Sequence, residues 1–343
     1  MGVFDFVKIF RVNKSISIDL GTANILIYDK QRKKIVLNEP SVVARDRKTG
    51  RLIAVGKEAR EMLGKTPDSI QAIKPLQDGV IADIDSTKEM ITYFIHKIYG
   101  NSLFKPEVMI CVPIEVTSVE RKALFDAVKG AKKTYIIEEG RAAIIGSGVD
   151  ISQPEGSMVI DIGGGSTDIA ILSLDEIIAS KSIRIAGNRF DEDIVRYVKR
   201  KYNLLIGDRT AEKIKKELGS ALKVQSPEVM EIKGRDLETG IPNTVEVNAN
   251  EIYEAIEDSL FQIVNSTKEV LEKCPPELAA DILDNGIVMT GGGSLIRNFI
   301  DMMEKEVGIK VFLSPNPLDS VVLGGGAAFD NKKLLRTLQM KEN

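Results

Sequence analysis

The chain has 343 residues, of which 43% are hydrophobic and 28% are charged, and its formal net charge is −3. This length is enough for two sizeable domains, and the near-neutral charge gives no drive toward nucleic acid, so no nucleic-acid partner is expected. Because the chain has only two cysteines and one histidine, His96, we exclude a disulfide framework, a zinc site and Ser-His-Asp catalysis.

The first predicted element is a short amphipathic helix at the N-terminus. Apolar residues recur there at helical spacing, and basic residues lie mostly off this stripe. The residues expected to enter a membrane are Val3, Phe4, Phe6, Val7 and Phe10. A short basic helix of this kind suits an anionic membrane surface, although a helix or strand docked on the domain itself is the alternative. No apolar run approaches a membrane span and no secretory signal is present, so we expect a cytoplasmic protein.

An internal repeat is the strongest feature of the sequence. Residues 16–27 and 158–172 each contain an apolar strand, an aspartate, a glycine turn with hydroxyl residues and a second apolar strand. The two aspartates, Asp19 and Asp161, are 161 − 19 = 142 residues apart. Each segment predicts a β-hairpin whose tight turn carries backbone N–H groups. Strand-rich and helix-rich segments alternate after both hairpins, which predicts an α/β fold in duplicate.

The remaining elements follow from periodicity and breaker residues. We expect strands over 107–113, 134–137 and 286–290. Helices are expected over 118–130 with Ser118 as the cap, from 141 onward, over 189–202, 210–222 and 250–273, and from Val321 as the last helix. The stretches 32–79 and 187–247 are more charged and are inserted between core elements, as smaller outer subdomains would be.

Both glycine turns suit the phosphates of a nucleotide. Glycine tolerates positive φ and lets backbone N–H groups approach an anion closely. The candidate residues are Thr22, Ala23 and Asn24 in the first turn and Gly163, Gly164 and Gly165 in the second. Asp19 and Asp161 are candidates to hold the water shell of Mg²⁺, which keeps most of its waters in proteins. In the alternative interpretation, both aspartates merely cap hairpin turns.

A third glycine turn and one helix could take the nucleoside. The turn contains Gly291, Gly292, Gly293 and Ser294, and it follows another buried strand. In the helix that begins near Thr210, Glu212 offers a carboxylate for ribose hydroxyls, and the stems of Lys213 and Lys216 could flank a base. The alternative for this helix is a solvated charged face. Together the three turns predict binding of a purine nucleoside triphosphate, and ATP is the nucleotide that we expect.

These motifs resemble the actin superfamily and, within it, the MreB family of bacterial actins. Further matching phrases are Asn38-Glu-Pro-Ser-Val-Val, Asp78-Gly-Val-Ile-Ala-Asp83, Ile206-Gly-Asp-Arg-Thr-Ala-Glu212 and Cys274-Pro-Pro-Glu. The resemblance implies an actin-like, ribonuclease-H-like α/β fold of duplicated domains, with ATP or ADP and Mg²⁺ in a central cleft. It implies four subdomains after a membrane-binding segment at 1–14: IA at 15–31, 80–145 and 325–343, IB at 32–79, IIA at 146–186 and 248–324, and IIB at 187–247.

The same resemblance implies a function. Family members polymerise with ATP into filaments on the inner face of the cell membrane and govern cell shape. The expected partners are other copies of the chain, the membrane, and paralogues or other cell-shape proteins. Glu139 matches the residue that orients the attacking water, Ser166 matches an assisting hydroxyl, and Leu103 and Phe104 match a membrane-inserting loop.

Several residues depart from the family pattern. Gly140 and Arg141 stand where the family usually has proline and an apolar residue, and Ser166 and Asp168 stand for threonine and glutamate. We expect Gly140 to loosen the turn that aims Glu139, so that hydrolysis is slow.

Two other classes of protein use related phosphate turns. A sugar or acetate kinase needs a base for its acceptor, and no phrase of this sequence points to one. A chaperone-type ATPase needs a peptide-binding domain after the ATPase, whereas this chain stops soon after Gly326.

Overall fold

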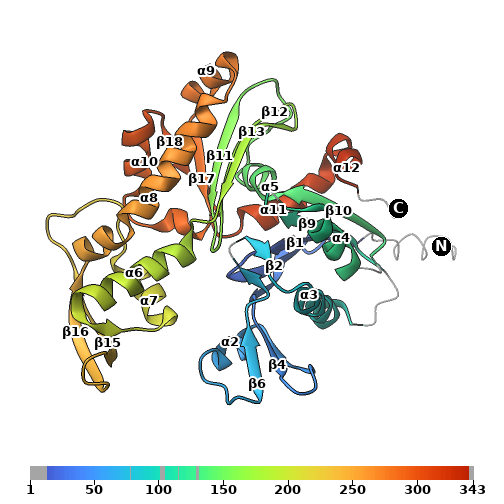
Figure 1. The fold of residues 1–343 in the computed structure, drawn as a ribbon. Coiled ribbons are helices and arrows are strands. Elements are labelled where there is room, and N and C mark those ends of the chain that lie inside the picture. Colours follow the sequence, from blue (N-terminus) through green and yellow to red (C-terminus); the bar gives the residue numbers. More distant parts are fainter. Residues whose placement is uncertain (1–13, 78, 101–104, 115, 129–130, 340–343) are drawn as a thin grey trace. The chain divides into compact units, whose positions relative to one another are not determined.

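The computed structural model describes residues 14–77, 79–100, 105–114, 116–128 and 131–339 (Figure 1). The N-terminal apolar stripe and the pair Leu103 and Phe104 lie outside these residues. The chain divides into two compact units by its internal contacts. The first unit takes in Met1–Val112, Val116–Glu138 and Val321–Asn343, and the second takes in Pro113–Glu115 and Glu139–Ser320. The limits proposed for four subdomains stay a prediction.

Each unit is built on a five-stranded sheet. In the first sheet the order is β10 (Lys133–Glu138), β9 (Glu107–Val112), β1 (Ser15–Leu20), β2 (Asn24–Asp29) and β3 (Lys34–Pro40). In the second sheet the order is β18 (Val311–Leu313), β17 (Ile287–Thr290), β11 (Ser157–Ile162), β12 (Thr167–Ser173) and β13 (Glu176–Ile183). In both sheets the hairpin strands pair antiparallel and the strands on the other side pair parallel. The predicted duplication is therefore confirmed.

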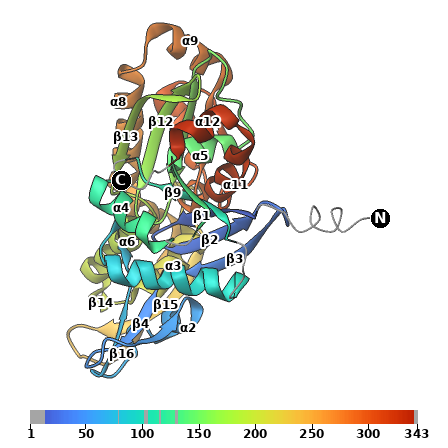
Figure 2. The same ribbon diagram turned by 90° about the vertical axis from the view of Figure 1, so that its right-hand side faces the viewer.

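The first unit covers its sheet with helices. They are α3 (Ile84–Tyr99), α4 (Ser118–Ala127), the part of α11 (Ser320–Ala327) from Val321 onward, η2 (Ala328–Asp330) and α12 (Lys332–Leu338). Figure 2 shows α3 running alongside the strands of the first hairpin, and α3 packs against α4. Its buried face carries Met90, Ile91 and Phe94, which join the alternating isoleucines of β1 and β2 in one core. A smaller part contains β4 (Val43–Asp46), β5 (Leu52–Val55), α2 (Lys57–Met62), β6 (Ile70–Ile73), β7 (Leu76–Gln77) and β8 (Val80–Ile81).

Two sequence predictions about this unit are wrong in detail. The cap of α4 is Thr117 rather than Ser118, because Thr117 has an extended backbone and exchanges hydrogen bonds with Glu120 in a capping box. The helix that contains Val321 is α11, and it is not the last helix, since η2 and α12 follow it.

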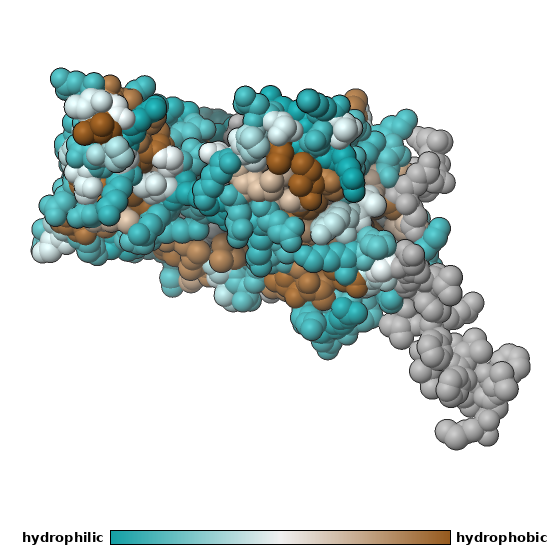
Figure 3. Space-filling view, turned by 90° about the horizontal axis from the view of Figure 1, so that it is seen from below, coloured by the Kyte–Doolittle hydropathy of each residue, from teal (hydrophilic) through white to brown (hydrophobic). Residues whose placement is uncertain are grey.

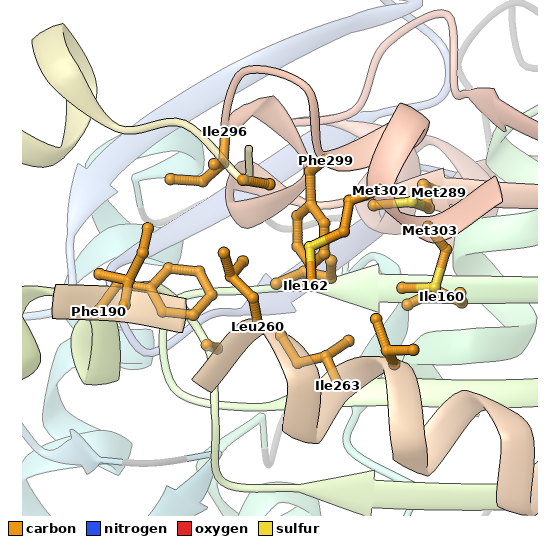
Figure 4. Close-up of a cluster of buried hydrophobic side chains, with 14 of the residues drawn as sticks. Ile160, Ile162, Phe190, Leu260, Ile263, Met289, Ile296, Phe299, Met302 and Met303 are labelled. Carbon is orange, nitrogen blue, oxygen red and sulfur yellow. The ribbon is translucent and has the colours of Figure 1, made fainter. Parts of the chain in front are cut away.

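The second unit packs its long helix against its sheet. Its helices are α5 (Glu139–Gly146), α6 (Gly187–Tyr202), α7 (Asp208–Leu218), α8 (Ala249–Glu272), α9 (Pro276–Asn285), η1 (Gly292–Leu295) and α10 (Phe299–Val307). Figure 4 shows Leu260 and Ile263 of α8 in one cluster with Ile160 and Ile162 of β11 and Phe299 of α10. This close-packed core fixes the end of β11, where the second glycine turn begins. A three-stranded sheet of β14 (Leu204–Leu205), β15 (Val229–Asp236) and β16 (Pro242–Asn248) completes the unit.

Helix α7 is shorter than predicted. It ends at Leu218 instead of residue 222, because Gly219 leaves helical geometry as the C-cap and donates its N–H to Lys215 O.

The surface contains separate apolar patches. The face drawn in Figure 3 is mostly hydrophilic, and its hydrophobic residues occur as separate groups. Among the residues that the structure describes, no helix is both long and apolar enough to cross a membrane.

Candidate nucleotide-binding site

Two carbonyl groups of the turn between β1 and β2 accept hydrogen bonds from one residue, Ser41. The Ser41 hydroxyl donates to Gly21 O at 2.6 Å, and the Ser41 N–H donates to Ala23 O at 3.1 Å. In a trans peptide the C=O and the N–H point in opposite directions. The N–H groups of Thr22 and Asn24 therefore point away from Ser41, on the opposite side of the turn.

This first turn depends on glycine. A Cβ atom on Gly21 would lie 2.6 Å from Asn24 O, a distance that real Cβ atoms do not tolerate. Thr22 is buried, and its Oγ1 accepts the N–H of Gly79 at 3.2 Å. Asp19 is half-buried one step before the end of β1, opposite Leu26. The predicted residues of the first half thus lie together at one end of the hairpin.

The turn between β11 and β12 also has two carbonyl groups bonded on one side. Its carbonyl groups at Gly163 and Gly164 accept the N–H groups of Gly187 at 3.1 Å and Asn188 at 2.8 Å, which open α6. The next two N–H groups, of Gly164 and Gly165, therefore point away from α6. Successive N–H groups on one side of a turn form a concave site for an anion. A phosphate group fits this arrangement.

Sequence reasoning did not single out the residues that orient these two turns. Ser41 lies inside the matching phrase Asn38-Glu-Pro-Ser-Val-Val, which was its only signal. Gly187 and Asn188 carry no local signal, because their role depends on α6 being placed beside the second turn.

The third glycine turn packs directly on β11. Gly291 has φ of +80°, and a Cβ atom there would lie 2.5 Å from Asp161 Oδ1 and 2.3 Å from Ile162 O. A Cβ atom on Gly293 would lie 2.3 Å from Ile162 Cγ2. The parallel pairing of β11 with β17 brings their carboxyl ends to the same edge. The structure therefore brings Asp161 and the third turn together, as the sequence predicted only separately.

The predicted nucleoside residues lie on the exposed side of α7. Lys213 and Lys216 are exposed, and Glu212 pairs with Lys216 at 2.7 Å. Lys215, which the sequence did not single out, instead points inward. Its Nζ contacts Gly187 O at 2.8 Å and Asp191 Oδ1 at 2.8 Å. Since Gly187 also holds the second glycine turn, Lys215 connects α7 to that turn.

The predicted catalytic residues lie on neighbouring elements of the second unit. Glu139 is the first residue of α5, which packs against β11 and β12. Ser166 is buried in the second turn, and its carbonyl accepts the Gly163 N–H at 2.9 Å. Asp168 is buried opposite Asp161, and its Oδ1 accepts the Ile114 N–H at 3.3 Å.

The expectation that Gly140 loosens a turn is wrong. Gly140 is buried in the first turn of α5, where a Cβ atom would lie 3.2 Å from Ala170 Cβ and 3.4 Å from Ile114 Cδ1. Glycine here lets α5 lie close to β12. Arg141 is also buried, and its Nη2 pairs with Glu176 at 3.6 Å, so the charged residue is accommodated by an ion pair.

The chemistry of the site fits a hydrated cation. Within the described ranges, no group of three or more His, Cys, Asp or Glu side chains could hold a metal ion by itself. A magnesium ion here would take its direct ligands from phosphate and water, which is the binding mode that Mg²⁺ prefers. Asp19 and Asp161 each stand at the strand end next to a glycine turn, where a carboxylate can receive hydrogen bonds from such waters.

Comparisons with known proteins agree on one family. The sequence model described as MreB/Mbl protein matches residues 13–337. The cell shape-determining protein Mbl of Bacillus subtilis is 49% identical over 321 residues, covering 93% of this chain and 96% of that protein. The cell shape-determining protein MreB of Escherichia coli is 47% identical over 326 residues, covering 93% and 94%.

Solved structures are similar over nearly the whole chain. MreB5 of Spiroplasma citri bound to ADP has a TM-score of 0.88 at 39% identity and covers 95% of this chain and 98% of that one. The same protein bound to AMPPNP also has a TM-score of 0.88, at 38% identity. A MamK double helical filament has a TM-score of 0.79 at 22% identity, covers 93% of this chain and 99% of that one, and is similar in fold.

Proposed function

The chain belongs to the MreB/Mbl family, and on that premise we propose that it binds ATP, hydrolyses it and polymerises into filaments that govern cell shape on the inner face of the cell membrane. Two of its relatives are named as cell shape-determining proteins. Structures of MreB5 hold ADP and AMPPNP, and the MamK structure is a double helical filament.

The observation that carries this proposal is the matching construction of the two glycine turns. In each turn, carbonyl groups are bonded on one side, and N–H groups point to the other. We assign phosphate binding to Thr22, Ala23 and Asn24 and to Gly163, Gly164 and Gly165. We assign the nucleoside to Glu212, Lys213 and Lys216 and to the third turn, Gly291 to Ser294. Mg²⁺ would neutralise charge on the phosphates, with Asp19 and Asp161 holding its waters.

We assign hydrolysis to Glu139, with Ser166 assisting. Phosphoryl transfer depends mostly on positioning and charge neutralisation, so one carboxylate that orients a water is sufficient beside the phosphate turns. Glu139 is held at the start of α5, and the packing of α5 on β11 and β12 fixes that start relative to the second turn.

The contacts that flank the two candidate membrane segments support binding to one surface. Lys14, the last residue of the N-terminal segment, accepts the N–H of Glu107 at 2.7 Å through its backbone carbonyl. The Lys14 ammonium also lies 5.2 Å from the ring centroid of Tyr99, just before residues 101–104. The described residues that border the two candidate segments are therefore neighbours beside the start of β1, and this supports the proposal that both segments bind the same membrane.

Sedimentation and phosphate release test the filament and the hydrolysis separately. We expect the wild-type chain to sediment with ATP or ADP, and electron microscopy of the pellet to show filaments. Glu139→Gln should bind ATP as the wild type does but release phosphate about 100-fold more slowly, as expected for loss of a general base. Glu138→Gln is the matched control, because Glu138 is paired with Arg121 at 3.7 Å.

A different experimental result would contradict each part of the proposal. No nucleotide-dependent sedimentation at any reasonable concentration would reject the filament. Unchanged phosphate release by Glu139→Gln would reject the role of Glu139 and leave nucleotide binding in place.

A further inference from the structure

Arg297 binds the C-terminal end of α7. This residue follows η1, the helix of the third glycine turn. Its Nη2 donates to Leu218 O at 3.0 Å and its Nε donates to Gly219 O at 3.2 Å. Its Nη1 pairs with Glu228 at 2.6 Å, and this hydrogen bond holds the pKa of Glu228 below its usual range.

Two further contacts strengthen the same junction. The backbone N–H of Ala221 donates to Arg297 O at 2.7 Å, and the side-chain amide of Asn298 donates to Ser220 Oγ at 2.9 Å. A Cβ atom on Gly219 would lie 2.3 Å from Lys215 O and 3.2 Å from Ile296 Cδ1, so glycine permits this close approach. The segment after α7 and the segment after the third turn are therefore joined along several residues.

The guanidinium group suits this position for electrostatic reasons. The last carbonyl groups of a helix have no partner inside the helix and carry partial negative charge. A planar fork of N–H donors can satisfy two of them at once, which a lysine ammonium cannot do with the same geometry. Lys215 anchors α7 to Gly187 beside the second turn, so Arg297 supplies the second fixed point, at the third turn.

We propose that Arg297 is a positioning residue for the nucleoside, because it sets the spacing between α7 and the third glycine turn. This inference rests on the proposed assignment of those two elements to the base and ribose. Arg297 acts through the backbone of Leu218 and Gly219, and the N–H groups of the two hairpin turns remain the phosphate contacts. Loss of Arg297 should therefore weaken binding of the nucleoside part of a nucleotide and spare binding of the phosphates.

The test compares ADP with magnesium pyrophosphate, which carries the two phosphates without the nucleoside. Calorimetric titration of the full chain should show Arg297→Ala binding ADP about tenfold more weakly, the effect of losing a charged hydrogen bond, and binding pyrophosphate as the wild type does. Arg297→Lys should lose part of the ADP affinity, because it keeps the charge and loses the fork. Arg196→Ala is the matched control, since Arg196 forms an ion pair with Asp193 on the exposed side of α6 in the same unit.

The possible outcomes separate this inference from the proposed function. Equal loss of affinity for ADP and pyrophosphate, or no loss for either, overturns the role of Arg297 alone. If the wild-type chain binds no ADP, both the inference and the proposed function are overturned. If Arg297→Ala does not fold, the test uses the ratio of the ADP affinity to the pyrophosphate affinity of Arg297→Lys. A ratio equal to that of the wild type overturns the inference.

Discussion

A buried hydroxyl group holds the first glycine turn in place. Replacing Ser41 by alanine removes the donor to Gly21 O, so the peptide that presents the Thr22 N–H is free to rotate. We expect Ser41→Ala to weaken binding of both ADP and pyrophosphate by about threefold to tenfold, as loss of one hydrogen bond of about 1 kcal/mol predicts. Calorimetric titration with the two ligands measures this effect.

The control for Ser41 is another buried serine of the same unit. Ser86 donates its hydroxyl to Asp83 Oδ2 at the start of α3, in another part of the unit from the turn. Ser86→Ala should lower the stability of the unit and leave affinity for both ligands unchanged. Equal affinity losses in the two variants would show that Ser41 has no particular role in the turn.

Glu251 couples the stability of the second unit to pH. It is the third residue of α8, completes the capping box with Asn248, and accepts hydrogen bonds from Lys201 at 2.5 Å and Tyr202 at 2.5 Å. Burial by itself would raise the pKa of Glu251, but the hydrogen bonds from Lys201, Tyr202 and the Asn248 N–H together hold it below the ordinary value of 4.5.

A lowered pKa in the folded state makes the ionised Glu251 stabilising. This contribution is fully present above the unfolded pKa near 4.5 and is lost as the pH falls through the lower folded pKa. Glu251→Gln should therefore be less stable at pH 7 and should lose less stability on acidification. Urea unfolding measured at pH 7 and at several values below 4.5 checks this, and parallel pH profiles for the two proteins would contradict it.

Helix α11 lies close to the first sheet because of its glycines. A Cβ atom on Gly325 would lie 2.2 Å from Ser17 Oγ and 2.9 Å from Cys111 Sγ. We expect Gly325→Ala to destabilise the first unit by about 1–3 kcal/mol through overpacking. Adding Ser17→Ala removes the nearest clashing atom, so the double variant should recover part of the loss. Urea unfolding of the wild type, the two single variants and the double variant measures the coupling free energy between the two substitutions. Strictly additive changes in the free energy of unfolding would rule out the clash.

The two units contain a second pair of similar turns, which local sequence patterns do not reveal. The hairpins β4–β5 and β15–β16 turn through Asp46-Arg-Lys-Thr-Gly50 and Asp236-Leu-Glu-Thr-Gly240. In both, the aspartate Oδ1 accepts the N–H and the hydroxyl of the threonine, which lowers the pKa of that aspartate. The shared pattern is only a few residues long, so it does not stand out from ordinary turns.

The whole chain has the actin-like fold that the sequence predicted. The two sheets repeat one order of strands, and the similarity to MreB5 extends over 95% of the chain with a TM-score of 0.88. The predicted family is also confirmed by the match over residues 13–337. These agreements follow from local signals, since strand periodicity, glycine turns and motif phrases are all contiguous in sequence.

The proposed membrane binding belongs to the scale of the whole molecule, because it depends on how many copies of the N-terminal segment act together. Replacing Phe4, Phe6 and Phe10 by alanine removes apolar area from the N-terminal stripe, and we expect at least about tenfold weaker binding to anionic vesicles. The effect should be larger with ATP than without nucleotide, because a filament repeats the segment many times. Vesicle co-sedimentation with anionic and with neutral lipid measures both effects. Unchanged binding by the triple variant would reject the N-terminal anchor.

Contiguous patterns were therefore sufficient for the two Asp–glycine hairpins, the duplicated sheets, most helices and the candidate phosphate residues. The residues that hold these turns in place could be identified only from contacts between residues far apart in the sequence. Ser41 is 20 residues from Gly21, Lys215 is 28 residues from Gly187, and Arg297 is 78 residues from Gly219. Their partners are backbone carbonyl groups, which every residue carries, so no sequence pattern could identify these contacts before the packing of α6, α7 and the third turn was known.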